Sequence, residues 1–168
     1  MTAAVSPQAR NFMNRQVRTV TPDVPLADVV TLLIEQGISN VPVVQREGER
    51  SLLVGFISER DCLEHLSNEA FYGSPMPPQT AGTVMRKHPV CVDPGTELFT
   101  LVSIFVHHGY RHLPVVDADN QLLGLVSRRD ILRALDEFYR QSLREHDQQH
   151  FPPDVHELIH HRFLMKGR

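Results

Sequence analysis

The stretches GFISERD at residues 55–61 and GLVSRRD at residues 124–130 decide the fold of this chain, because they share the pattern Gly-x-x-Ser-x-x-Asp. Each stretch follows an apolar run and opens a segment with helical spacing of its apolar residues. The two copies are offset by 69 residues. A pattern of this length that recurs in the same local context indicates an internal repeat.

The repeat extends upstream of this motif at an offset of 72 residues. The matching pairs are Met13 and Met85, Val20 and Val92, Pro22 and Pro94, Leu26 and Leu98, Gly37 and Gly109, and the Pro-Val-Val runs at 42–44 and 114–116. The offset falls from 72 to 69 because the polar loop at 46–50 is longer than the loop at 117–120. A register that slips only in a turn favours two copies of one structural unit.

Each copy predicts the element order β-α-β-β-α. Apolar residues spaced i, i+3, i+4, i+7 and i+8 predict amphipathic helices over 26–34 and 98–106, and the glycines that follow predict helix ends. The predicted strands are short runs at 17–20, 41–44 and 52–57 in the first copy and at 90–92, 113–116 and 122–126 in the second. Ser58 and Ser127 each begin a further helix.

We therefore predict a mixed α/β (α+β) fold in which two such repeats pack with pseudo-two-fold symmetry, followed by a C-terminal helical tail. The predicted boundaries are an N-terminal arm at 1–11, repeats at 12–66 and 83–136, a linker at 67–82 and a tail at 137–168. The linker is rich in Pro and Gly. A single repeat is too small to bury a stable core, so both repeats are expected to form one folding unit.

Composition excludes several classes of protein. The 168 residues have a formal net charge of −3, with 41% hydrophobic and 22% charged residues, which is ordinary for a globular protein. No basic excess favours nucleic acid, and no apolar run has the roughly 20 residues that span a bilayer. Cys62 and Cys91 form no disulfide framework, and we expect a cytoplasmic protein with free thiols.

The paired motifs resemble the cystathionine β-synthase (CBS) domain, present here as a tandem pair or Bateman module over roughly residues 12–136. The resemblance implies a regulatory module without catalytic activity, and no nucleophile elbow, P-loop or dinucleotide fingerprint favours an enzyme. It implies that an adenosine-containing ligand binds between the repeats. We expect AMP, ADP or ATP, and expect S-adenosylmethionine or NADH less. The alternative is a structural dimerisation module without a nucleotide.

The same resemblance assigns site residues. It implies one site at Ser58 and Asp61 and another at Ser127 and Asp130, with each Asp on the ribose hydroxyls. It also implies that each site takes residues from the start of the other copy, so that Asp93 joins the site of Asp61, and Thr21 joins the site of Asp130. Because the Asp93 carboxylate would oppose a phosphate, we expect the site of Asp130 to bind nucleotide more tightly.

The residue chemistry agrees with a nucleotide. A carboxylate can accept two hydrogen bonds from a ribose diol, and a Ser at a helix N-terminus lies where anions are favoured. The basic candidates for phosphate contacts are Arg60, Arg111, His112, Arg128 and Arg129. Ser-x-x-Asp is also close to a capping box, so each motif can equally serve to cap its helix.

The C-terminal tail carries an apolar stripe and many histidines. Val155, Leu158, Ile159 and Phe163 predict a short amphipathic helix that packs on the module or on a partner subunit. The pairs His146 with His150 and His156 with His160 have the i, i+4 spacing of a metal site, but a solvated helix face is favoured because no Cys lies near. The expected partners are an adenosyl ligand, a second copy in a homodimer and a regulated protein in trans, with neither nucleic acid nor membrane.

Overall fold

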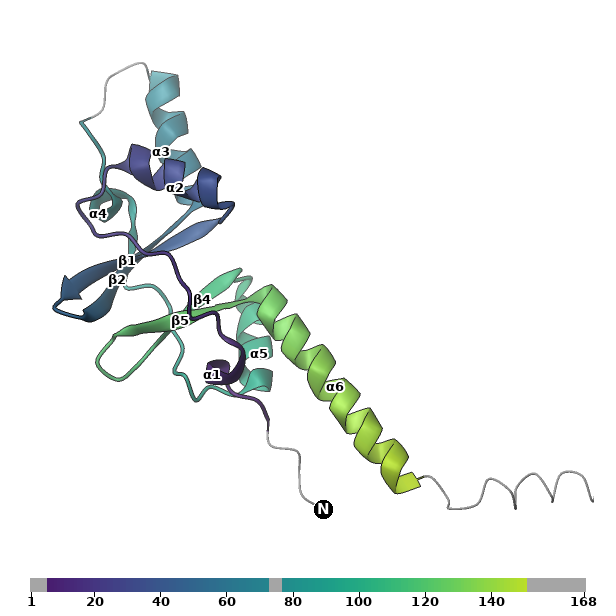
Figure 1. Cartoon of the computed structure of the whole chain (residues 1–168). Helices are drawn as coiled ribbons and strands as arrows, with labels where there is room; N and C mark the ends of the chain where they lie inside the picture. The colour runs from purple at the N-terminus through teal and green to yellow at the C-terminus, as the bar shows by residue number, and fades with distance from the viewer. Residues whose placement is uncertain (1–5, 73–76, 151–168) are drawn as a thin grey trace, which may run out of the picture.

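The computed structural model describes residues 6–72 and 77–150, and Figure 1 shows two halves that lie against each other through their strands. Each half contains a helix, an antiparallel two-stranded hairpin and a second helix, in that order. The mixed fold with two repeats and a C-terminal helix is therefore confirmed.

The described elements occur in nearly the same sequence in the two halves. The first half contains α2 (Leu26–Gln36), β1 (Asn40–Glu47), β2 (Arg50–Ser58) and α3 (Glu59–Tyr72), and the second contains α5 (Leu98–His108), β4 (His112–Val116), β5 (Leu122–Ser127) and α6 (Arg128–His150). Three short elements precede them: α1 (Ala9–Phe12) comes before the first half, and α4 (Ala81–Val84) and β3 (Arg86–Lys87) come before the second.

The helices α2 and α5 end where the sequence predicts. Gly37 and Gly109 follow them with φ of 58° and 66°, the left-handed conformation that glycine adopts without the steric cost of a side chain. The hairpins that follow also correspond, because both contain a bulge before a matching valine of the first strand, at Val43/Val44 and at Val115/Val116. The repeat in the sequence is thus a repeat in structure down to its irregularities.

The strands predicted at 17–20 and 90–92 are wrong in extent, because each is reduced to a single parallel bridge, Val20 to Val43 and Val92 to Val115. Val20 N–H donates to Pro42 O at 3.2 Å, and Val44 N–H donates to Val20 O at 2.9 Å. The next rung of a parallel ladder would need an N–H from Pro42, which proline does not have. Pro114 stops the second ladder in the same way.

The segments that lead into the two halves are exchanged between their cores. Ala9 and Met13 are buried with side chains of the second half, whereas Ala81 and Val84 are buried with those of the first. Each crossing segment is anchored on the other half's strand, because Asn14 N–H donates to Leu125 O at 2.8 Å and Arg86 pairs with Phe56. Each half therefore completes its core with residues that precede the other.

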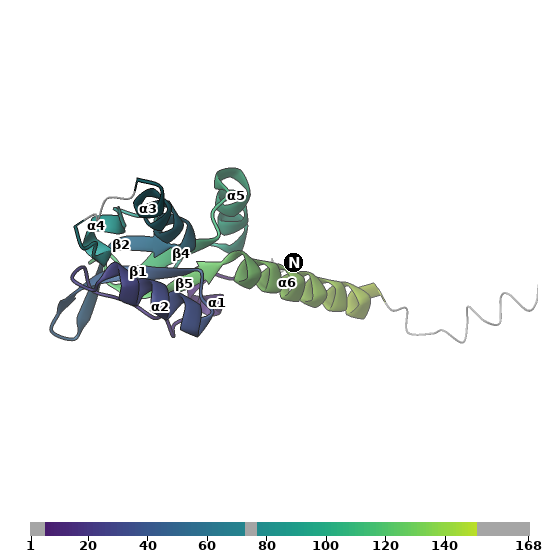
Figure 2. The ribbon, with the colours of Figure 1, turned by 90° about the horizontal axis from the view of Figure 1, so that it is seen from above.

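Two predicted boundaries differ from the observed helices. The helix α3 continues to Tyr72, within the predicted linker 67–82, and α6 runs without a break from the second motif through the polar tail segment to His150. Figure 2 shows α6 projecting from the body of the molecule. The apolar stripe of Val155, Leu158, Ile159 and Phe163 lies outside the described residues.

Candidate ligand cleft between the repeats

The two Ser-x-x-Asp motifs have the same local geometry, at the point where a strand passes directly into a helix. Asp61 Oδ2 accepts hydrogen bonds from the backbone N–H and the hydroxyl of Ser58, at 2.8 and 2.6 Å. Asp130 Oδ2 accepts the same two bonds from Ser127, at 2.8 and 2.5 Å. Both motifs therefore cap their helices, and these cap bonds engage only Oδ2 of each carboxylate.

Asp61 differs from Asp130 in what its second oxygen contacts. Asp61 Oδ1 accepts a hydrogen bond from Arg86 Nε at 2.8 Å, and the Asp61 side chain is only 8% exposed. Burial alone raises the pKa of Asp61, but the hydrogen bonds from Ser58 and the Arg86 ion pair outweigh burial and hold this pKa below its ordinary value. Asp61 is thus a buried carboxylate that stays ionised at neutral pH.

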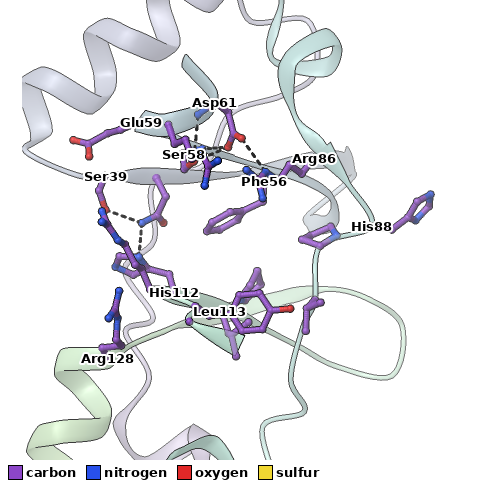
Figure 3. Close-up of a pocket in the computed structure, with 18 of the residues that line it drawn as sticks. Ser39, Phe56, Ser58, Glu59, Asp61, Arg86, His88, His112, Leu113 and Arg128 are labelled. Atoms are coloured by element: carbon purple, nitrogen blue, oxygen red, sulfur yellow. Dashed lines mark hydrogen bonds and ion pairs between the residues drawn. The ribbon is translucent and has the colours of Figure 1, made fainter. Parts of the chain in front are cut away.

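A cavity of about 670 Å³ opens beside Asp61, within the size range of small-molecule sites. Its walls come from both halves, and Figure 3 shows Ser58 and Asp61 facing His112 and Leu113 across the space, with Phe56 between them. The lining is mixed. Apolar and aromatic side chains come from Phe56, Pro89, Val90, Tyr110, Leu113 and Pro114, and charged ones from Glu59, Arg60, Asp61, Arg86, Lys87, Arg111 and Arg128.

The structure brings together only part of the predicted site. The predicted residues that line the cavity are Ser58, Arg60, Asp61, Arg111, His112 and Arg128, and those that do not are Thr21, Asp93, Ser127, Arg129 and Asp130. Asp93 Oδ1 instead accepts a hydrogen bond from Gly95 N–H at 2.6 Å. The expected repulsion between Asp93 and a phosphate at Asp61 therefore has no basis in the cavity.

Sequence reasoning missed the residues that the second lead-in segment contributes, namely Arg86, Lys87, His88, Pro89 and Val90. It expected the start of the second copy to reach the site of Asp61 and named Asp93, which lies farther along the chain than the residues that line the cavity. A signal was present in the repeat itself, because Arg86 directly follows Met85, which matches Met13. A partly buried apolar residue such as Met85 fixes the backbone next to it, so it can also fix the position of the arginine that follows.

The two halves meet at a contact between equivalent residues. Asn40 Nδ2 lies 2.7 Å from His112 Nδ1, and these residues are 72 positions apart, which is the offset of the repeat. Burial lowers the pKa of His112, and Arg111 and Arg128 lower it further against the opposing effect of Asp130. The ring is therefore neutral at pH 7, and its Nδ1 can accept a hydrogen bond from the Asn40 amide N–H. This bond marks the pseudo-two-fold axis at the rim of the cavity.

The histidines of the tail gain no support as a metal site from the described part of the chain. Among residues 6–72 and 77–150, no group of three His, Cys, Asp or Glu side chains could hold a metal ion. His146 and His150 lie on α6 where side chains are not described, and His156 and His160 lie outside the described residues. Within those described ranges, too, no helix is both long and apolar enough to cross a membrane.

The two halves have the same element order and contact each other through their strands. Both contribute residues to the cleft, so the chain is a tandem-repeat pair. A family model described as CBS domain matches residues 9–68 and 81–137, which is more than half of the chain. The chain therefore belongs to the CBS-domain family, and the resemblance found in the sequence is confirmed.

Relatives with curated sequences share most of this chain. An uncharacterised protein of Methanocaldococcus jannaschii is 30% identical over 130 residues, which are 77% of this chain and 44% of that protein. An uncharacterised 17.7 kDa protein of Acidianus ambivalens is 31% identical over 120 residues, which are 71% of this chain and 68% of that protein. The chain thus spans less than half of the first relative and about two thirds of the second.

Solved structures show the same fold. CBSX2 of Arabidopsis thaliana, solved in complex with AMP, is 26% identical, has a TM-score of 0.66, and the match covers 79% of this chain and 98% of that one. A CBS domain pair solved in complex with 5′-methylthioadenosine and S-adenosyl-L-methionine has a TM-score of 0.65 and covers the same shares, at 18% identity. Because its sequence identity is only 18%, the similarity to this second structure shows the fold alone.

Proposed function

We propose that this chain is a regulatory module that binds a phosphate-bearing adenine nucleotide in the cleft beside Asp61. The observation that carries the proposal is the cleft itself, in which a buried, ionised carboxylate faces basic and aromatic side chains from both halves. Asp61 would accept hydrogen bonds from the ribose hydroxyls. The basic side chains would contact phosphate, and the apolar walls would contact the base. CBSX2, solved with AMP, supports this class of ligand.

The charge of the cleft favours a phosphorylated ligand. Five basic side chains line it, Arg60, Arg86, Lys87, Arg111 and Arg128, against the two carboxylates of Glu59 and Asp61. This local positive excess occurs in a chain whose formal net charge is −3. Clefts with one sign of charge concentrate ligands of the opposite sign. AMP, ADP and ATP fit this potential better than S-adenosylmethionine, whose sulfonium adds a positive charge.

A regulatory role follows from where the ligand would lie. The cleft has one wall from each half, and the halves are also tied at Asn40 and His112 and at Arg50, which donates to Asp119. A nucleotide that contacts both walls would favour the arrangement of the halves that binds it better. A separate regulated protein would bind one arrangement of the halves better than the other. This role needs no catalytic group of the chain.

A panel of ligands tests the nucleotide proposal directly. We expect AMP, ADP or ATP to stabilise the protein by about 2.7 kcal/mol at 100 times its Kd, seen as a rise in Tm, because binding only the folded state shifts unfolding by mass action. S-adenosylmethionine and NADH are expected to give smaller rises. If no adenosyl ligand shifts Tm, the nucleotide proposal fails and the structural dimerisation module is favoured instead.

We also propose that two copies pair through the outer helices. Ile34 on α2 and its equivalent Val106 on α5 are 75% and 73% exposed, and the equivalent Leu63 on α3 and Leu132 on α6 are 67% and 68% exposed. Large apolar side chains left uncovered at matching places in both halves favour a symmetric apolar interface, and homodimers are the commonest closed assembly.

The Leu63→Glu variant is expected to convert a dimer into a monomer, because the new carboxylate would be buried against apolar side chains at the interface. Sedimentation velocity at micromolar concentration measures the mass directly. Gln45→Glu is the matched control, since it adds the same charge at an exposed position on β1. A wild-type chain that sediments as a monomer would refute the pairing.

A further inference from the structure

The carboxylate that would hold the ribose is already occupied by an arginine of the same chain. Arg86 Nε donates to Asp61 Oδ1 at 2.8 Å, while Ser58 holds Oδ2. A carboxylate has about four acceptor positions, and three of those of Asp61 are already used, two by Ser58 and one by Arg86. A ribose diol that donates both of its hydroxyls to Asp61 must therefore take the place of Arg86 at Oδ1.

The position of Arg86 allows its side chain to move away from Asp61. Its side chain is 62% exposed, whereas that of Asp61 is 8% exposed, so water can solvate the guanidinium after the ion pair opens. The backbone of Arg86 stays fixed, because β3 pairs Arg86 with Phe56 and Lys87 with Gly55. The displaced side chain would remain at the cavity wall, where its planar fork can bind phosphate oxygens.

The second half shows that this ion pair is not part of the repeated fold. Asn14 pairs with Leu125 as Arg86 pairs with Phe56, and an asparagine therefore stands where the arginine would be. Ser127 holds Asp130 as Ser58 holds Asp61. Among the described residues, no basic side chain forms an ion pair with Asp130. The fold forms without this arginine in one half, so Arg86 is a feature of one site.

We propose that Arg86 is a specificity-determining residue that makes this cleft select phosphorylated nucleotides over unphosphorylated adenosyl ligands. The inference rests on the proposed function of the cleft. A ligand whose ribose diol donates both hydroxyls to Asp61 opens the Arg86–Asp61 ion pair, and only a ligand with phosphate gives Arg86 a new anionic partner. Adenosine and methylthioadenosine leave Arg86 without one, so their affinity is reduced by the full cost of opening the pair.

The Arg86→Met variant tests this selection because it keeps the aliphatic stem and removes every donor. Isothermal titration calorimetry with AMP and with adenosine is expected to show opposite changes: AMP binds about tenfold more weakly, and adenosine binds several-fold more tightly, because nothing then competes for Asp61 Oδ1. Lys87→Met is the matched control, with the same loss of charge on the next residue of β3. It is expected to weaken AMP without strengthening adenosine.

The binding of AMP by the wild-type chain tests the proposed function, and the variants of Arg86 and Lys87 test the role of Arg86. If the wild-type chain binds AMP and Arg86→Met weakens AMP and adenosine by the same factor, Arg86 only supports the structure and the inference is overturned. Equal effects of Arg86→Met and Lys87→Met on both ligands overturn it as well, because charge alone then explains the affinity. If the wild-type chain binds neither ligand, both proposals fall.

Discussion

Replacing Asp61 by Asn is expected to weaken the binding of AMP by about 100-fold, which corresponds to about 3 kcal/mol at 25 °C. Asp61 is buried and ionised, so two hydrogen bonds from a ribose diol to it would be charge-assisted and shielded from water. Asn is neutral, and it offers one acceptor oxygen, which Ser58 already engages in the helix cap. Calorimetry with AMP measures the loss, and a far-UV circular dichroism spectrum that matches the wild type shows that the fold is intact.

Asp130→Asn is the matched control for Asp61→Asn, because Ser127 and Asp130 repeat the same cap but lie outside the lining of the cavity. We expect it to change the affinity for AMP by less than about twofold, within the scatter of surface substitutions. The opposite ranking, with the loss at Asp130, would contradict the proposed site. It would instead support the sequence-based expectation that the site of Asp130 binds more tightly.

The repeat predicted the fold, but it indicated Arg86 only indirectly, through its place next to the matched residue Met85. Ser58 and Asp61 were found because they belong to the shared motif, and shared residues mark where both halves need the same local structure. Arg86 has no such counterpart, since Asn14 stands in its place. Matching the two copies therefore places residue 86 beside a shared apolar residue, but it does not predict an arginine there, because the other copy has an asparagine.

The exchange of lead-in segments agrees with what the family resemblance implied, but the chain order alone does not predict it. Met13 and Met85 each precede an apolar helix, and an apolar side chain in that place can pack on either half. The structure resolves the choice through close approach, because a Cβ built on Gly55 would lie 2.9 Å from Met85 Cβ, and one on Gly124 would lie 2.7 Å from Asn14 O. The Gly of the motif is therefore explained by a neighbour that is remote in sequence.

Replacing Gly124 by Ala is expected to lower the free energy of unfolding by about 3 kcal/mol, from overpacking together with lost hydrogen bonds. The new Cβ would lie 2.7 Å from the backbone oxygen of Asn14 and 3.0 Å from Met13 Sδ. A backbone oxygen cannot rotate away as a side chain can. The segment must therefore shift, which strains the paired bonds of 2.8 and 2.9 Å between Asn14 and Leu125 and loosens the buried Met13.

Urea unfolding measures this loss, and Gly48→Ala is its control. Gly48 has φ of 61° and nothing within 4 Å of a Cβ placed on it, so Ala there adds left-handed backbone strain of about 1 kcal/mol without a clash. The difference between the two variants isolates the close approach of the lead-in segment to β5. If Gly124→Ala costs no more than Gly48→Ala, the segment is not held against the strand, and the exchanged packing of the two cores is wrong.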